Sequence, residues 1–152
     1  MLYAAVPSAV AGSDQPSAVE QRHAMNLTPE GFKWDKIFPE LGEQSAEITM
    51  LREDPNTHAT QLMIRIPKNF HVPLHWHTAG ETITIVNGTF ILECEGTRAV
   101  LTQGAFNYMP GKMTHEAWTE AKEGALLFIT VDGKWDINWV AGPPKRSDVI
   151  RE

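Results

Sequence analysis

Apolar and polar residues alternate in short runs from residue 46 to about residue 140. In the segment 60–66, Leu62, Ile64 and Ile66 fall on one face of an extended chain, a period of two that is typical of a half-buried β-strand. Turn-forming Gly, Pro, Asn and Asp residues separate the runs. The pattern predicts ten short strands, at residues 46–51, 60–66, 71–77, 81–86, 89–95, 97–102, 105–110, 115–120, 125–131 and 134–140.

The connections between these runs favour antiparallel neighbours. Asn-Gly at 87–88 and Asp-Gly at 132–133 are strong signals for two-residue hairpins. Residues 27–42 have Pro and Gly near both ends, which predicts an irregular lead-in and not a long helix. Many short strands with almost no helix indicate an all-β protein, either a sandwich or a barrel.

A chain of 152 residues is expected to form one domain with a real core. We expect a single domain over residues 31–142 and a polar C-terminal tail over 143–152. Residues 1–30 are rich in Ala, Ser, Pro and Gln. They predict either an ordinary N-terminal arm or the remnant of a signal peptide, because Ala9 to Ala11 fits a small-x-small cleavage site.

Composition excludes several classes of function. The formal net charge of −6 argues against a nucleic-acid partner, which requires a basic face. No run of about 18 apolar residues is present, so no membrane-spanning helix is expected. The single cysteine, Cys94, excludes an internal disulfide and any Cys-rich zinc site.

The candidate chemistry begins at the segment HWHTAGE, residues 75–81. His75 and His77 lie two apart and share one face of a strand, whereas Trp76 points to the other face. A short turn follows, and a hairpin here would place Glu81 beside the two imidazoles. These three side chains form half of a shell for a divalent cation. A fourth ligand has to come from elsewhere, and the candidates are His115, which is best placed, His71, His58 and His23.

Two segments resemble the paired motifs of the cupin superfamily. The stretch HWHTAGETITIVNG is similar to the first motif, H-x-H-x3-E-x6-G, through His75, His77, Glu81 and Gly88. The stretch GAFNYMPGKMTH is similar to most of the second motif, G-x5-P-x-G-x2-H, through Gly104, Pro110 and His115. It departs from that motif at Lys112, which stands where a glycine is customary.

The resemblance is closest to small single-domain bacterial cupins. It implies a double-stranded β-helix, the jelly-roll barrel, and a metal held by His75, His77, Glu81 and His115. Members of that subgroup often carry a signal peptide before a segment similar to KWDKIFP, residues 33–39. A periplasmic or secreted origin is therefore favoured over a cytoplasmic one. The resemblance also implies a homodimer, in which residues 27–51 add a strand to the partner's sheet.

Three imidazoles and one carboxylate suit one divalent metal ion. Fe(II) is favoured, and Mn(II), Ni(II), Zn(II) and Cu(II) are alternatives. With iron, the natural function is a dioxygenase-type oxidoreductase that acts on a small molecule in the barrel. A lyase or isomerase and a non-catalytic metal- or ligand-binding cupin remain open, so enzyme status is itself open. Cupin lyases that cleave dimethylsulfoniopropionate use a tyrosine two residues after the motif glutamate, and Ile83 stands there in this chain.

Two further residues are candidates for catalytic roles. Tyr108 could serve as an acid or hydrogen-bond donor near the metal, although a plain wall residue is the alternative. His71 could be a proton shuttle, because positions 71, 73 and 75 share a phase in a regular strand. The alternative for His71 is a surface histidine at the start of its strand.

Overall fold

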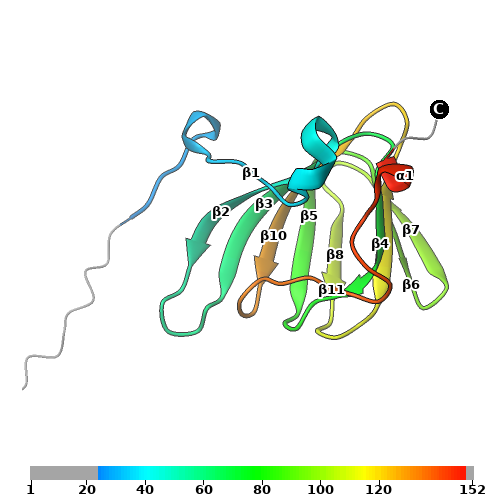
Figure 1. Ribbon diagram of the computed structural model, residues 1–152. Coiled ribbons are helices and arrows are strands. Elements are labelled where there is room, and N and C mark those ends of the chain that lie inside the picture. Colours follow the sequence, from blue (N-terminus) through cyan, green and yellow to red (C-terminus); the bar gives the residue numbers. More distant parts are fainter. Residues whose placement is uncertain (1–23, 150–152) are drawn as a thin grey trace, which may run out of the picture.

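The computed structural model describes residues 24–149 as two antiparallel β-sheets that pack face to face (Figure 1). The six-stranded sheet has the order β1 (Asp35–Lys36), β2 (Glu47–Glu53), β3 (Thr60–Ile66), β10 (Ala125–Val131), β5 (Glu81–Gly88) and β8 (Phe106–Met109). The five-stranded sheet has the order β11 (Asn138–Trp139), β4 (His71–Trp76), β9 (His115–Thr119), β6 (Phe90–Cys94) and β7 (Thr97–Leu101). The predicted all-β jelly roll is confirmed.

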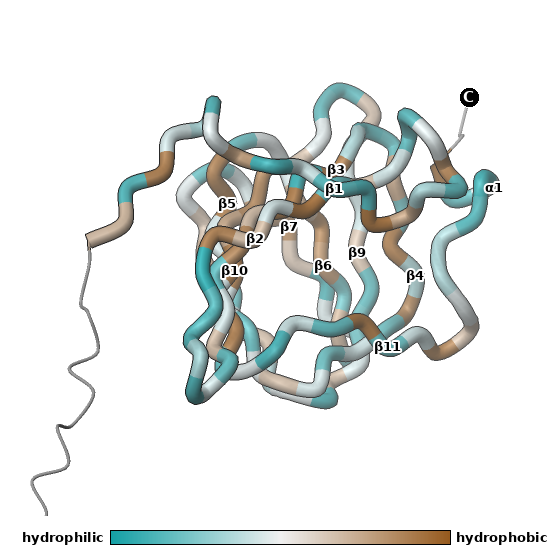
Figure 2. The backbone as a smooth tube through the Cα atoms, turned by 60° about the vertical axis from the view of Figure 1, so that its left-hand side comes forward, coloured by the Kyte–Doolittle hydropathy of each residue, from teal (hydrophilic) through white to brown (hydrophobic). Residues whose placement is uncertain are grey.

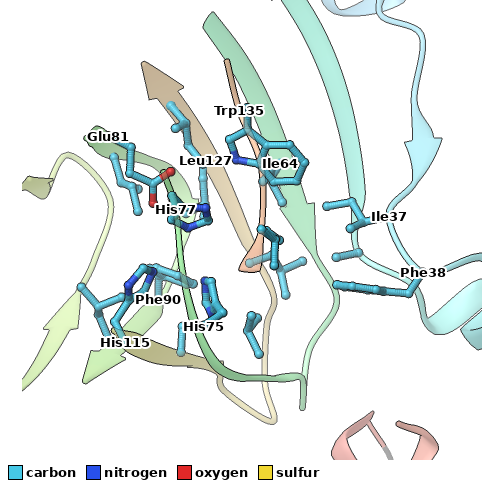
Figure 3. A pocket seen from close by; sticks show the side chains of 18 residues that line it. Ile37, Phe38, Ile64, His75, His77, Glu81, Phe90, His115, Leu127 and Trp135 are labelled. Atoms are coloured by element: carbon cyan, nitrogen blue, oxygen red, sulfur yellow. Dashed lines mark ion pairs between the residues drawn. The ribbon is translucent and has the colours of Figure 1, made fainter. Parts of the chain in front are cut away.

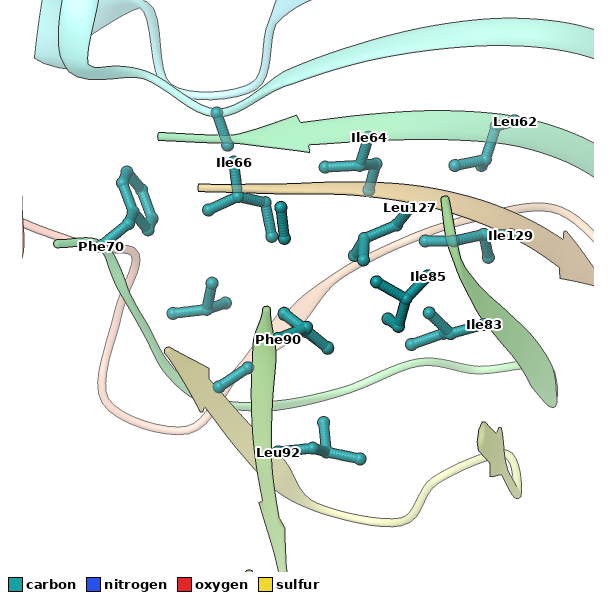
Figure 4. Packing of buried hydrophobic residues seen from close by; sticks show 14 of the residues in the cluster. Leu62, Ile64, Ile66, Phe70, Ile83, Ile85, Phe90, Leu92, Leu127 and Ile129 are labelled. Carbon is teal, nitrogen blue, oxygen red and sulfur yellow. The ribbon is translucent and has the colours of Figure 1, made fainter. Parts of the chain in front are cut away.

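The core lies between the two sheets and follows from the alternation of the strands. Leu62, Ile64 and Ile66 of β3 are buried, as their spacing predicts, whereas Arg65 between them is exposed. Every second residue of β10 is buried in the same way. Figure 4 shows these side chains beside those of β5 in the same sheet and facing those of β6 in the opposite sheet. In Figure 2 the apolar residues recur along the strands and the connecting loops are mainly polar.

The two predicted hairpins at 87–88 and 132–133 are wrong. β5 and β6 lie in different sheets, and so do β10 and β11, so each turn carries the chain across the sandwich. Gly88 has φ of 80°, and a Cβ there would lie 2.0 Å from the carbonyl oxygen of Gly124. The glycine therefore serves a close backbone approach and not a two-residue turn.

The lead-in closes one end of the core. It consists of two short 3₁₀ turns, η1 (Pro29–Gly31) and η2 (Pro39–Gln44), with the edge strand β1 between them. Phe38 stacks on Phe70, with ring centroids 6.0 Å apart, and Leu41 is buried. The irregular character predicted for residues 27–42 is confirmed, apart from the two residues of β1.

The C-terminal segment folds back onto the barrel. It ends in a single turn of helix, α1 (Arg146–Val149), which packs against β4 and buries Val149. Within residues 24–149, no helix is long and apolar enough to cross a membrane. The cleavage site proposed at residues 9–11 and the candidate ligand at position 23 lie outside the described residues.

Candidate metal centre

A β-bulge in β4 decides which of its histidines face the core. Opposite β9, His71 and Val72 pair with Trp118 and Ala117, and the next pair is His75 with His115. Between these pairs, Pro73 and Leu74 of β4 lie opposite a single residue of β9, so β4 has one additional residue there. A proline at a bulge removes no hydrogen bond from the ladder. The bulge reverses the phase, so the expectation that positions 71, 73 and 75 share a face is wrong.

Three imidazoles meet at one end of the core. His75 ends the bulge, His77 follows β4 directly, and His115 opens β9. Their side chains are buried, and one ring nitrogen from each lies within 4.8 Å of the other two. Figure 3 shows the rings converging on a common space. The three residues could hold a metal ion.

Hydrogen bonds orient each ring toward that space. In each case Nδ1 donates to a backbone carbonyl, and these carbonyls belong to Pro73 (2.7 Å, to His75), Asp136 (to His77) and Met113 (3.0 Å, to His115). With the proton on Nδ1, the lone pair of Nε2 is the one available to a metal.

Burial keeps the three imidazoles neutral. Burial, with smaller contributions from the neighbouring His115 and His77, lowers the pKa of His75 to about 3. Burial also lowers the pKa values of His77 and His115. Neutral imidazole is the form that binds a metal, so the cluster needs no deprotonation at neutral pH.

Glu81 reaches the same space from the other sheet, as the first residue of β5. Its Oε1 lies 3.4 Å from Nε2 of His77, whereas its buried Oε2 has no hydrogen-bond partner among the described residues. Burial raises the pKa of Glu81 to about 7, an effect that His115 partly offsets. A buried carboxylate oxygen without a partner is costly, and a bound cation would remove that cost. The donor set fits a divalent metal.

The segment 78–80 between these ligands crosses between the sheets and is not the hairpin turn that the sequence predicts. It is held from two sides. The Asp136 carboxylate accepts hydrogen bonds from the backbone N–H and the hydroxyl of Thr78, at 2.8 and 2.6 Å. Lys112 donates its backbone N–H to the carbonyl of His77 at 2.7 Å. Lys112 occupies the customary glycine position with φ of 65°, so the left-handed conformation is kept without the glycine.

The cluster lies at the polar end of a cavity between the two sheets. Its remaining walls are apolar side chains from both sheets and the lead-in, among them Ile37, Phe38, Ile64, Ile83, Phe90, Leu127 and Trp135 (Figure 3). Among the described residues that line it, the ionisable ones are the three histidines and Glu81.

Sequence reasoning missed two residues of this site, Trp135 and Asp136. The run 134–140 predicts a strand there, but only residues 138–139 are extended in the sheet, and the segment before them covers the cavity. Nothing in the spacing of these residues marks them, because their partners are more than 50 positions away in the chain.

The two predicted catalytic residues are not brought into the cavity. His71 lies on the outer face, where its ring nitrogens contact Glu116 at 2.9 Å and Asp148 at 3.1 Å. Tyr108, on β8, is 53% exposed. The remaining candidate ligand that the structure describes, His58, is exposed and pairs with Glu53.

Comparison with known proteins places the chain in a family. Residues 2–138 match the family described as "Domain of unknown function (DUF4437)". No curated protein sequence matches the chain.

Solved structures give the fold. An RmlC-like cupin from Ralstonia eutropha matches with a TM-score of 0.59 and 18% identity, over 73% of this chain and 69% of that one. An RmlC-like cupin from Shewanella frigidimarina matches at 0.58 and 21%, over 86% and 99%. The dimethylsulfoniopropionate (DMSP) lyase DddQ from Ruegeria pomeroyi matches at 0.63 and 16%, over 75% and 64%. The chain belongs to the DUF4437 family, and it has the fold of the RmlC-like cupins.

Proposed function

We propose that this cupin is a metal-dependent oxidoreductase of the dioxygenase type, with one divalent ion held by His75, His77, His115 and Glu81. The metal site is supported by one observation: three neutral imidazoles with protonated Nδ1 atoms face a buried carboxylate whose Oε2 has no hydrogen-bond partner among the described residues. Fe(II) is favoured, and Mn(II), Ni(II), Zn(II) and Cu(II) fit the same donors.

The cavity walls support oxidative chemistry over proton-transfer chemistry. A lyase or isomerase needs a side chain that moves a proton, in addition to the metal ligands. Among the described residues that line the cavity, none is ionisable apart from those four ligands. Ile83, at the position where the DMSP-cleaving cupins are expected to carry tyrosine, is a buried apolar wall residue.

Each part of the chain then has a defined task. A bound iron(II) supplies electrons for reaction with dioxygen and a point that orients the substrate. The backbone carbonyls of Pro73, Asp136 and Met113 hold the imidazoles in place. The apolar walls bind the body of a small substrate and exclude water from the reacting end.

Anaerobic metal analysis followed by oxygen-uptake measurements tests the proposal. Protein produced with iron is expected to hold one iron per chain and to consume oxygen with some members of a panel of small organic acids and enols. His77→Ala should lose both properties, and the exposed His58→Ala is the matched control that should keep both.

Each other outcome points elsewhere. Turnover with zinc or manganese that ignores oxygen would favour a lyase or isomerase. Metal binding without turnover on broad panels would favour a binding cupin. Protein that takes up no divalent ion would overturn the proposal.

Two further proposals concern the whole molecule. We propose a homodimer in which residues 27–51 extend the partner's sheet; its support is that β1 lies at the edge of the six-stranded sheet. Light scattering tests it, and a monomeric mass would contradict it.

We also propose that the protein is exported to the periplasm or secreted. Fractionation of cells that express the gene tests this proposal.

A further inference from the structure

Trp135 brings an unsatisfied donor to the metal end of the cavity. It lies in the segment between β10 and β11, and its ring centroid is 6.3 Å from that of His77. Its Nε1 is buried and has no hydrogen-bond acceptor among residues 24–149. In Figure 3 this nitrogen is turned toward the side on which Glu81 and His77 lie.

The proposed metal does not satisfy this group. An indole N–H is a donor only, so it cannot ligate a cation. Two buried side-chain atoms of the cavity, Oε2 of Glu81 and Nε1 of Trp135, have no hydrogen-bond partner among residues 24–149, so they do not bond to each other. A cation would satisfy the first of them. The second requires an acceptor atom from whatever molecule fills the cavity.

The net charge of the metal-loaded cavity indicates what charge that molecule should have. A divalent ion opposite one carboxylate leaves one positive charge in a buried space. No Lys, Arg or Asp is among the described residues that line the cavity. Because an unbalanced buried charge is costly, a ligand with one negative charge is preferred over a neutral one or a dianion. The remaining walls are apolar and accommodate a compact hydrocarbon body.

We propose that the cavity binds a small monoanionic organic acid, with an apolar body among the two sheets and an anionic oxygen that accepts a hydrogen bond from Nε1 of Trp135. The inference rests on the proposed metal centre, since the metal supplies the positive charge that the ligand balances. Trp135 is thereby a residue that determines specificity and is not a metal ligand.

Zinc-loaded protein gives a test that does not depend on turnover. Benzoate and isobutyrate serve as monoanionic probes, and benzamide and isobutyramide serve as neutral probes of the same shapes. The indole N–H signals of ¹⁵N-labelled protein report the contact, because the chain has five tryptophans and Trp135→Phe identifies the relevant signal. Trp118→Phe is the matched control, since Trp118 stacks on His71 at the outer face.

At least one acid should bind more tightly than its amide and shift the Trp135 signal. Trp135→Phe should weaken acid binding roughly ten-fold or more at unchanged zinc content, because it removes a hydrogen bond to a charged acceptor. Trp118→Phe should bind as wild type does. If neither acid binds the zinc-loaded protein, if amides bind equally well, or if Trp135→Phe retains full affinity, this inference is wrong while the metal centre stands. If zinc itself is not retained, the proposed function fails first.

Discussion

His75 and His71 lie four residues apart on β4, and their surroundings are opposite. His75 faces the core beside two other imidazoles, with no carboxylate hydrogen-bonded to it in the described structure. His71 faces outward between the carboxylates of Glu116 and Asp148. It also stacks in parallel on Trp118, with ring centroids 5.0 Å apart.

These different surroundings indicate different roles: His75 belongs to a site that binds a ligand, and His71 makes a structural contact. At the outer site every polar atom of the imidazole has a partner within the chain, so the site is complete as it stands. The inner site brings three imidazoles together beside the carboxylate of Glu81, one oxygen of which has no hydrogen-bond partner among residues 24–149. Proteins retain such an arrangement where something from outside completes it, because unsatisfied buried groups cost stability.

Removing one histidine from each site should produce the largest difference between the two sites. His115→Ala should weaken metal affinity by about 1,000-fold or more, since loss of a direct ligand exceeds the 10- to 100-fold cost typical of outer partners. His71→Ala should leave metal affinity within a few-fold of wild type. Competition with a chelator measures both. Equal losses in the two variants would mean that the outer site also supports the metal.

The second test concerns the cost of the buried carboxylate. Glu81 has a folded pKa of about 7 against an ordinary value of 4.5, so the metal-free fold favours its protonated form. The stability from this group is present below pH 4.5 and is lost as the pH rises through 7. In metal-free protein, Glu81→Gln should therefore match wild type near pH 4 and exceed it at pH 8 by up to about 3 kcal/mol.

Denaturant unfolding at the two pH values checks this prediction for Glu81→Gln. The same variant should bind metal more weakly, which would show that the inner site gives up stability for ligand binding. A variant no more stable than wild type at pH 8 would indicate that the carboxylate is satisfied without a metal.

The outer site should matter for stability alone. His71→Ala removes two part-buried contacts to carboxylates and the stacking on Trp118, and it loosens α1 through Asp148. The free energy of unfolding should fall by about 1–2 kcal/mol, the scale of part-exposed charged hydrogen bonds. Chemical denaturation of the metal-free protein measures this change. An unchanged midpoint would show that the contacts contribute nothing net.

The smallest expected effect tests the support of His77. Asp136→Ala keeps the backbone carbonyl that accepts from His77, but it removes both hydrogen bonds from Thr78. Metal affinity should fall about ten-fold, the lower end for an outer partner. Asp132→Ala, four positions earlier and exposed, is a control that should bind as wild type does. If wild type, Asp136→Ala and Asp132→Ala bind the metal equally well, contacts other than the Asp136 carboxylate orient His77.

Much of the architecture was predictable because strand periodicity is local. The alternation in 60–66 and 125–131 identifies β3 and β10 to the residue, and the sheet buries the faces that the pattern selects. The spacing of His75, His77, Glu81 and His115 likewise identified residues that the structure brings to one end of the cavity. A short motif can specify this much, since its residues lie on adjoining strand ends.

Connections between strands were less predictable. The turn at 95–96 joins β6 to β7 within one sheet, whereas the Asn-Gly pair at 87–88 carries the chain from one sheet to the other. Both turns contain a glycine with positive φ, so local chemistry does not distinguish them. β5 pairs with β10, about 40 residues later, and with β8, and these long-range contacts decide the topology.

The sequence by itself determined most of the strands, the all-β class and the His75, His77 and Glu81 part of the candidate metal centre, because each depends on spacing along a few neighbouring positions, whereas His115 followed from the second motif. Tertiary structure alone decided that a bulge opposite β9 turns His71 outward and His75 inward. It also decided that, in the part of the chain that the structure describes, Oε2 of Glu81 and Nε1 of Trp135 lie in one cavity without hydrogen-bond partners. The physical reason is that a hydrogen-bond partner, or its absence, is a property of the packed core and not of any one segment.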